Sequence, residues 1–299
     1  MSAIRLGTRA STLATTQSEM VAGLLRSEGL DVNLTTITTH GDTSTASLAA
    51  MGGIGVFASA IRAALLEGEA DIAVHSFKDL PTGRPLGLAI GAVPARADPR
   101  DALVARDGLT LHDLPQEASV GTGSPRRAAQ LLAVRPDLTI VDIRGNVDTR
   151  LGRVKGLGHY AKGGGKEDLD AVVLAASGLA RLGHSGTVTE FLDPSVVLPA
   201  PAQGALAVEC RTADSRHGKL AKALARIDDR RTRLAATAER AVLSHLEAGC
   251  AAPIGALAQL KPVSGSSPQV LTLDVVVATV DGSRIIREQV RVELPAEVD

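Results

Sequence analysis

The feature that most constrains this chain is the alternation of short apolar runs with amphipathic stretches along its 299 residues. The apolar runs predict strands at 4–7, 71–75, 119–121, 138–143 and 169–175. The amphipathic stretches predict helices at 11–28, 56–67, from Ser124, at 146–154 and at 232–247. Strands that alternate with helices in this way indicate an α/β protein.

Turn and loop signals divide this pattern. Two alternating strands around Asp281-Gly282 near the end predict a hairpin. Segment 41–55 is rich in Gly, Ser and Thr and suits a mobile loop, and the glycines of 156–168 predict a flexible surface insertion. The proline-rich segments 93–105 and 194–210 are typical of crossings between domains.

Composition excludes several classes of protein. A net charge of −1 and four aromatic residues provide neither the basic field nor the stacking surfaces of a nucleic-acid binder. No uncharged apolar run approaches the ~18 residues of a membrane span, and the start has no apolar signal core. We therefore expect a cytoplasmic protein. Seven histidines without paired spacing, and no Cys-x-x-Cys, predict no metal site.

Arginine is the residue type that points most directly to function. Arg126 and Arg127 lie in the first turn of a helix, where cations are normally disfavoured and anions are bound. Residues 121–155 carry seven Lys or Arg against three Asp or Glu, a local excess of +4. An anion held by guanidinium groups explains this pattern, and surface ion pairs are the alternative. Gly121-Thr122-Gly123-Ser124 adds backbone amides and a cap hydroxyl, without the spacing of a P-loop.

Two further candidates lie outside this arginine-rich stretch. Lys78-Asp79 follows an apolar strand, so Asp79 is either half of a strand-end salt bridge or a general acid/base or cation stabiliser. Cys210 lies within an apolar strand and is interpreted as a core residue. Cys250 is surrounded by Gly, Ala and Pro, which suits an accessible thiol in a loop.

These residues lie in motifs that resemble the porphobilinogen deaminase (hydroxymethylbilane synthase) family. The motifs include GTRASTLATTQ (7–17), ADIAVHSFKDLP (70–81), VGTGSPRRAAQL (120–131), IRGNVDTRL (143–151) and TAERAVLSHLEAGCAAPIGA (237–256). They run in order across almost the whole chain, so chance co-occurrence is negligible.

The resemblance implies two α/β lobes like those of type II periplasmic binding proteins, plus a small α+β C-terminal domain. Domain 1 is expected at 1–97 and 199–222, with a mobile loop at 41–57. Domain 2 is expected at 98–198, and domain 3, which carries Cys250, at 223–299. The family is mostly monomeric.

The resemblance also implies a dipyrromethane cofactor attached to Cys250 through a thioether. The family deaminates porphobilinogen and condenses four molecules head to tail, releasing hydroxymethylbilane. Asp79 corresponds to the catalytic aspartate, which contacts pyrrole N–H groups and stabilises the cationic intermediate. The residues implied to bind the cofactor and the growing chain are Cys250, Arg9, Ser11, Lys78, Asp79, Thr122, Ser124, Arg126, Arg127, Arg144, Asn146, Arg150 and Gln203.

The chain departs from the family pattern in three places. Ile54 stands where a loop lysine is common, and packing by Phe57 over the pyrroles is our hypothesis for a substitute. The insertion at 156–168 is longer than expected. Family chains usually continue past the last strand into a helix, whereas this sequence ends at Asp299.

Two other functions compete with this interpretation. A two-lobed anion receptor or effector domain would explain the arginines but not Cys250. A thiol hydrolase would need a histidine beside Cys250, and His245 is the near candidate in sequence.

Overall fold

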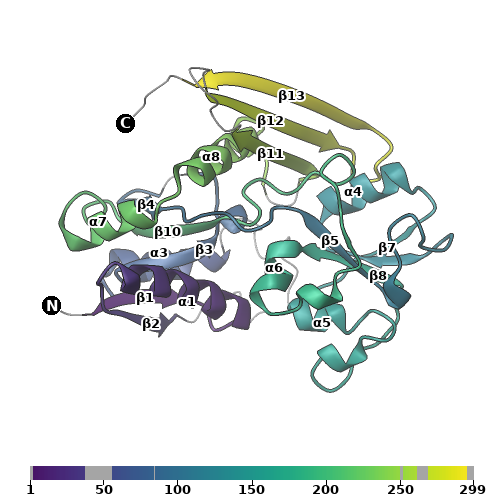
Figure 1. Cartoon of the computed structure of the whole chain (residues 1–299), viewed down its shortest axis with the longest axis horizontal. Coiled ribbons are helices and arrows are strands. Elements are labelled where there is room, and N and C mark those ends of the chain that lie inside the picture. The colour runs from purple at the N-terminus through teal and green to yellow at the C-terminus, as the bar shows by residue number, and fades with distance from the viewer. Residues whose placement is uncertain (1–2, 38–55, 84, 250–251, 261–268, 295–299) are drawn as a thin grey trace. The chain divides into compact units, whose positions relative to one another are not determined.

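The computed structural model describes residues 3–37, 56–83, 85–249, 252–260 and 269–294 (Figure 1). Its contacts divide the chain into two compact units: unit 1 is 1–97 with 204–250, and unit 2 is 98–203 with 251–299. The three-domain division expected from the sequence stays a prediction. The expected loop at 41–55 and Cys250 lie outside the described residues.

Unit 1 is built on a five-stranded sheet with the order β2-β1-β3-β10-β4. Its strands are β1 (Ile4–Thr8), β2 (Val32–Thr36), β3 (Ile72–Ser76), β4 (Leu88–Ala92) and β10 (Leu206–Arg211). β1 runs parallel to β2 and β3, whereas β10 is antiparallel to β3 and β4. Its helices are α1 (Thr12–Ser27), α3 (Val56–Leu66), the 3₁₀ turn η1 (Phe77–Asp79), α7 (Gly218–Ile227) and α8 (Arg230–His245).

Helices cover both faces of this sheet. Side chains of α1 and α7, among them Leu25 and Leu224, pack on one face, and α3 packs Ile61 on the other. Successive strand residues point to opposite faces, which is why Ile72, Ala73 and Val74 of β3 are all apolar and buried. Cys210 is 0% exposed within the first of these cores, which confirms its interpretation as a core residue.

Unit 2 repeats the topology with the order β7-β6-β8-β5-β9. Its strands are β5 (Asp101–Ala105), β6 (Ser119–Gly121), β7 (Thr139–Val141), β8 (Ala171–Ala175) and β9 (Glu190–Phe191). β6 runs parallel to β7 and β8, and β5 is antiparallel to β8 and β9, so the fourth strand is reversed in both sheets. The helices are α4 (Pro125–Val134), α5 (Val147–Leu151), α6 (Ala176–Arg181) and the 3₁₀ turns η2 (Arg106–Gly108), η3 (Gly158–Tyr160) and η4 (Ser185–Thr187).

A small antiparallel sheet follows, with the order β11-β12-β13. Its strands are β11 (Ile254–Leu260), β12 (Gln269–Ala278) and β13 (Ile285–Leu294). The predicted hairpin is confirmed, although its loop is 279–284 rather than a two-residue turn. Gly282 adopts a φ of 71° there, where a side chain would be strained. The two α/β lobes and the separate C-terminal sheet agree with the expected fold class.

Two segments differ from the sequence-based expectation. The segment 93–105, expected to be a crossing, also contains β5, because the run Ala102–Ala105 is fully buried in the sheet. Segment 156–168 lies at the surface, as expected for an insertion, but local hydrogen bonds close it into a loop. The backbone N–H groups of Gly156 and Gly158 both donate to Glu167 Oε1 at 3.0 Å, and Gly165 packs directly against the backbone of Gly152.

Candidate functional site

The first group of predicted site residues lies at the carboxyl edge of the sheet in unit 1. β1 and β3 are parallel neighbours, so the segments that follow them share one edge. Arg9 follows β1 directly, and Ser11 is the N-cap of α1, accepting a hydrogen bond from Ala14 N at 3.4 Å. Lys78 and Asp79 form the end of η1, directly after β3. The structure therefore brings these four residues to the same edge.

The exposure of this group suits a binding surface. The Asp79 side chain is exposed, whereas Lys78 and Arg9 are half-buried. Behind them Gln17 is 4% exposed, and its Nε2 lies 3.0 Å from Ser76 Oγ. This contact ties α1 to the last residue of β3, so the two elements that bear the group are held together.

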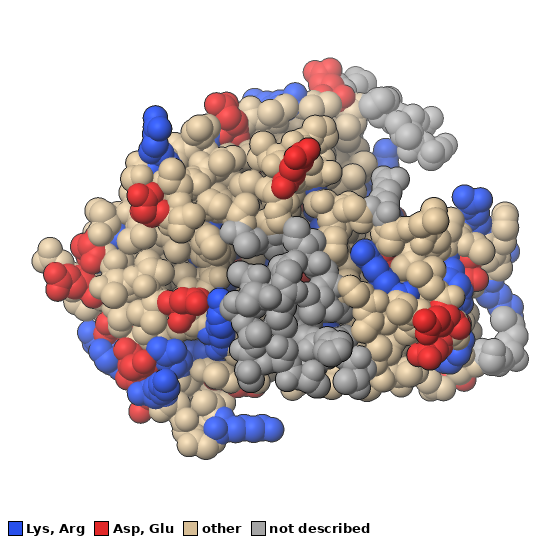
Figure 2. All heavy atoms as spheres, turned by 180° about the vertical axis from the view of Figure 1, so that it is seen from behind, with Lys and Arg blue, Asp and Glu red and all other residues tan. Residues whose placement is uncertain are grey.

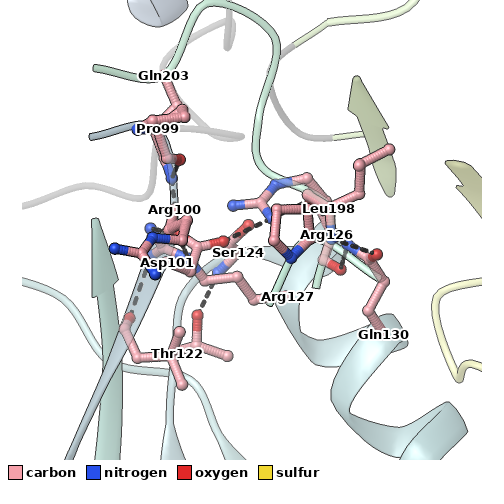
Figure 3. A network of polar contacts seen from close by, with 12 residues as sticks. Pro99, Arg100, Asp101, Thr122, Ser124, Arg126, Arg127, Gln130, Leu198 and Gln203 are labelled. Carbon is pink, nitrogen blue, oxygen red and sulfur yellow. Dashed lines mark hydrogen bonds and ion pairs between the residues drawn. The ribbon is translucent and has the colours of Figure 1, made fainter. Parts of the chain in front are cut away.

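The second group is centred on a residue that the sequence did not single out. Asp101 begins β5 opposite Ala175, the last residue of β8, so it lies at the carboxyl edge of the parallel strands. Arg126 Nη1 donates to Asp101 Oδ2 at 2.7 Å. Arg127 donates to Oδ1 from Nη2 at 2.7 Å and from Nε at 3.0 Å. Figure 3 shows both guanidinium groups converging on this carboxylate from the start of α4.

Burial makes these pairs electrostatically strong. Arg126, Arg127 and Asp101 are 4%, 6% and 0% exposed. Burial alone would raise the pKa of the Asp101 carboxyl, but the two guanidinium groups outweigh it and hold that pKa well below its usual range. The anion that the sequence indicates at this helix start is thus supplied, in the structure, by the chain itself. Because two arginines share one carboxylate, the three residues together carry a net charge of +1.

Glutamine side chains complete the Asp101 network. Gln203 is 0% exposed and donates from Nε2 to Asp101 Oδ1 and to Pro99 O, both at 2.8 Å. Gln130 accepts from Leu198 N at 2.8 Å and donates to Leu198 O at 3.1 Å. Leu198 O also accepts from Arg126 Nη1 at 2.7 Å. Arg126 Nη1 is therefore bonded to both Asp101 and Leu198 O. The carboxylate that pairs with the two arginines is itself held by Gln203.

The Thr122–Ser124 turn lies beside this network. Thr122 is 4% exposed, and its Oγ1 accepts a hydrogen bond from Ser124 N at 3.2 Å. Ser124 is the N-cap residue of α4, but its hydroxyl makes no capping bond, so the expected cap hydroxyl is not used in that way. A Cβ at Gly123 would lie 2.7 Å from Ile143 O, so this turn touches the segment that leads to Arg144.

The third group follows β7. Asn146 caps α5 by accepting from Thr149 N at 2.8 Å, and Arg150 Nε donates to Gly145 O at 2.9 Å. The Arg144 side chain is 55% exposed and lies 3.3 Å from Asp142. These residues share the carboxyl edge of β6 and β7 with the Thr122–Ser124 turn.

The excess of positive charge counted over residues 121–155 is partly neutralised in the structure by acidic residues from outside that window. Arg153 pairs with Asp168, and Lys155 Nζ lies 2.9 Å from Asp170. These acids, like Asp101, lie outside the 121–155 window. A charge count over a sequence window omits acidic partners that the fold brings from other parts of the chain.

Each of the two sheet edges, taken by itself, carries cations and neutral donors that can bind carboxylates. Guanidinium and ammonium groups bind carboxylates by charge-assisted hydrogen bonds, and hydroxyl and amide groups supply the weaker contacts. A dipyrromethane with acetate and propionate side chains is a ligand that carries such carboxylates. The class of protein is thus an α/β protein with two sheet-based lobes, each of which carries cations at the carboxyl edge of its sheet.

The chain belongs to the porphobilinogen deaminase family. The family model "porphobilinogen deaminase, dipyromethane cofactor binding domain" matches residues 4–219, and the C-terminal domain model matches 233–298. The chain is 97% identical over its full length to a porphobilinogen deaminase of Cutibacterium acnes, of which it covers 90%. It is 54% identical to that of Micrococcus luteus, with 100% of this chain and 85% of the relative covered.

Family membership establishes the activity and decides against the receptor and thiol-hydrolase alternatives. The chain is a transferase of porphyrin and haem biosynthesis that uses a dipyrromethane cofactor. It deaminates porphobilinogen and condenses four molecules into hydroxymethylbilane. Across the described residues, we find no helix with the length and apolarity to cross a membrane.

Proposed function

We propose that Cys250 holds the dipyrromethane through a thioether and that the three groups described above bind carboxylates of cofactor and substrate. The observation that carries this proposal is the placement of Arg9, Lys78 and Asp79 at one edge of one sheet. A thiolate is a good carbon nucleophile and the thioether it forms is stable, which suits a permanent anchor. When bound, the cofactor supplies a pyrrole with a free α-carbon on which the chain of substrates is built.

The proposed carboxylate ligands are those that the family motifs indicated. Cationic contacts come from Arg9, Lys78, Arg126, Arg127, Arg144 and Arg150, and neutral ones from Ser11, Thr122, Ser124, Asn146 and Gln203. Arg126 uses Nη1 for Asp101 and Leu198, so its Nε and Nη2 groups can serve a ligand carboxylate. Because each added pyrrole brings two more carboxylates, several separate cations suit a growing product better than one.

Asp79 is proposed as the catalytic carboxylate. Positive charge develops on the pyrrole nitrogen of the substrate as ammonia leaves, and a carboxylate placed beside that N–H stabilises it. Asp79 is exposed at the end of η1, where a ligand can reach it. Lys78, next in the same turn, would hold a substrate carboxylate and so orient the ring against Asp79.

We also propose that the protein works as a monomer in the cytoplasm and has no nucleic-acid or membrane partner. Figure 2 shows one face of the molecule, on which Lys and Arg side chains are interspersed with Asp and Glu. Such a surface lacks the single-sign field that attracts nucleic acid. The partner is then porphobilinogen alone.

The intact mass of the purified protein tests the anchor. We expect an addition equal to two linked pyrroles in the wild type and in Cys210→Ser, and none in Cys250→Ser. Cys210→Ser is the matched control because it removes the other cysteine of the chain. A fully active protein of unmodified mass, or an addition retained by Cys250→Ser, contradicts the proposal.

A further inference from the structure

We propose that Arg240 is a positioning residue for Asp79. Its guanidinium holds the turn that carries Asp79 against helix α8, and so fixes where the carboxylate points. The inference rests on the proposed catalytic role of Asp79. Arg240 itself is not proposed to touch the substrate.

The contacts of Arg240 surround Asp79 in sequence. Nη1 donates to Phe77 O and to Leu80 O, both at 2.8 Å, and Nη2 donates to Pro81 O at 2.7 Å. These carbonyls lie two residues before Asp79 and one and two residues after it. One planar group therefore fixes the backbone on both sides of the carboxylate.

The guanidinium also stacks on the turn. Arg240 Cζ lies 4.6 Å from the centroid of the Phe77 ring, in cation–π geometry. Arg240 is 8% exposed and Phe77 is 7% exposed, so both partners are buried. A planar fork that is stacked and hydrogen-bonded at once has little freedom to move.

The hydrogen bond within the turn is weak. η1 has three residues, and the hydrogen bond that closes it, from Leu80 N to Phe77 O, is 3.4 Å long. A cavity of about 630 Å³ adjoins the turn and is lined by Phe77, Leu80, Pro81 and Arg240 among others. The turn has room to shift on that side. Apart from the hydrogen bond that Phe77 N donates to Ala205 O at 3.0 Å, its backbone is held by the three bonds from Arg240.

Arg240 can hold the turn in place because helix α8, which carries it, is itself anchored at the neighbouring residue. The preceding residue, Glu239, is 0% exposed and accepts from Arg96 Nη1 at 2.6 Å and Nη2 at 2.9 Å. In sequence, Cys250 follows the end of α8 at His245 by five residues. The arginine thus connects the Asp79 turn to the helix that leads to the proposed attachment residue.

The same helix offers a matched control in Arg233. Its Nη1 and Nη2 donate to Ile90 O at 3.3 Å and Gly91 O at 3.2 Å, in β4, and its Nε binds Asp228. Arg233 therefore ties α8 to backbone carbonyls of unit 1, as Arg240 does, but not to the turn of Asp79. Loss of Arg233 should therefore weaken the attachment of α8 without moving the turn that carries Asp79.

The test compares Arg240→Lys and Arg240→Gln with Arg233→Lys and Arg233→Gln. For each variant kcat, KM for porphobilinogen, Tm and cofactor occupancy by intact mass are measured. We expect kcat to fall about 10-fold in Arg240→Lys and about 100-fold in Arg240→Gln, with KM changed by about twofold or less. Lysine retains part of the rate because its ammonium still donates to carbonyls, but from a point charge.

The Arg233 variants should also lower Tm, by less because Arg233 is 33% exposed, and should keep kcat within about twofold of the wild type. Equal kcat values in corresponding Arg240 and Arg233 variants, at full cofactor occupancy, overturn the inference. If Arg240→Gln does not fold, the two lysine variants decide between these outcomes. Asp79→Asn separates the two proposals: normal turnover there refutes the role of Asp79 itself, independently of Arg240.

Discussion

Asp101 and Arg126 form a fully buried ion pair, with 2.7 Å between Oδ2 and Nη1 and side-chain exposures of 0% and 4%. Arg127 pairs with the other oxygen of the same carboxylate at 2.7 Å. The carboxylate thereby partly compensates the charges of two consecutive arginines in a site from which water is nearly excluded. Without the carboxylate, two like charges would be buried side by side.

Asp101→Asn should therefore destabilise the protein strongly. Removing one partner of a buried charge network typically costs about 3–5 kcal/mol, because the remaining charges are left uncompensated. We expect a loss of that size in the free energy of unfolding at pH 7, measured by urea titration. The control is Asp98→Asn, whose partner Arg100 is 40% exposed and whose loss should cost about 1 kcal/mol or less. Equal losses in the two variants would show that burial adds nothing here.

Acid should destabilise unit 2 through Asp101 and Asp170. Both carboxyls have pKa values well below the usual range. Burial raises each pKa, but other contacts lower it by more. These contacts are hydrogen bonds from Lys155 and Ser119 at Asp170, and the two arginines at Asp101. A lowered native pKa adds stability that is complete above the unfolded-state pKa of about 3.9 and is lost as the pH falls below it.

The free energy of unfolding, measured in urea between pH 7 and pH 3, should fall steeply below about pH 4. Asp170→Asn should flatten that fall, because asparagine does not titrate. Asp142→Asn is the surface control, since Asp142 is 62% exposed, and it should change the free energy of unfolding at pH 7 by about 1 kcal/mol or less. An unchanged slope in Asp170→Asn is the result that contradicts the assignment.

Local patterns carried the sequence-based prediction of the fold. The helix predicted at 11–28 is Thr12–Ser27 with Ser11 as its cap, because its apolar period and its capping residue are both local. β5 was missed because Asp101 and the neighbouring prolines resemble a loop until the strand is seen between β8 and β9. Gly158 and Gly165, within 156–168, likewise serve close packing that no local pattern reveals.

The residue types of the candidate site could be predicted from the sequence, but the residues that each of them contacts could not. Cations at strand ends and helix starts are visible in the sequence, and the structure places them at the carboxyl edges of two sheets. Asp101 lies 25 residues from Arg126, and Arg240 lies 163 residues from Phe77. Such pairs form only when the topology brings distant strands and helices together. An acidic residue that opens a wholly apolar strand was the one available signal for Asp101.

The buried thiol of Cys210 should be inert in the native protein. Burial raises its pKa to about 11, so on the order of one molecule in a thousand carries the thiolate at pH 8. In Cys250→Ser we expect no reaction with a thiol reagent before unfolding and one thiol per chain after it. In the holoprotein, unfolding should also release one thiol rather than two, because Cys250 is blocked. Two thiols in the unfolded holoprotein would contradict the thioether.

Arg144→Gln should impair catalysis without weakening the fold. Its side chain is 55% exposed and its contact with Asp142 is 3.3 Å long, so it contributes little to stability. A lost charge-assisted hydrogen bond to a ligand carboxylate costs about 1.5–3 kcal/mol, which lowers kcat/KM for porphobilinogen by at least about 10-fold. Steady-state kinetics and Tm measure the two effects separately.

The control for this variant is Arg226→Gln, whose side chain is 68% exposed and pairs with Glu28 on the surface of unit 1. Both substitutions remove one exposed guanidinium, so a loss of long-range attraction for the anionic substrate would affect them equally and would shrink with added salt. A direct contact at Arg144 predicts instead that only Arg144→Gln loses activity and that most of the loss persists at high salt. Equal kcat/KM values in the two variants would remove Arg144 from the proposed carboxylate ligands.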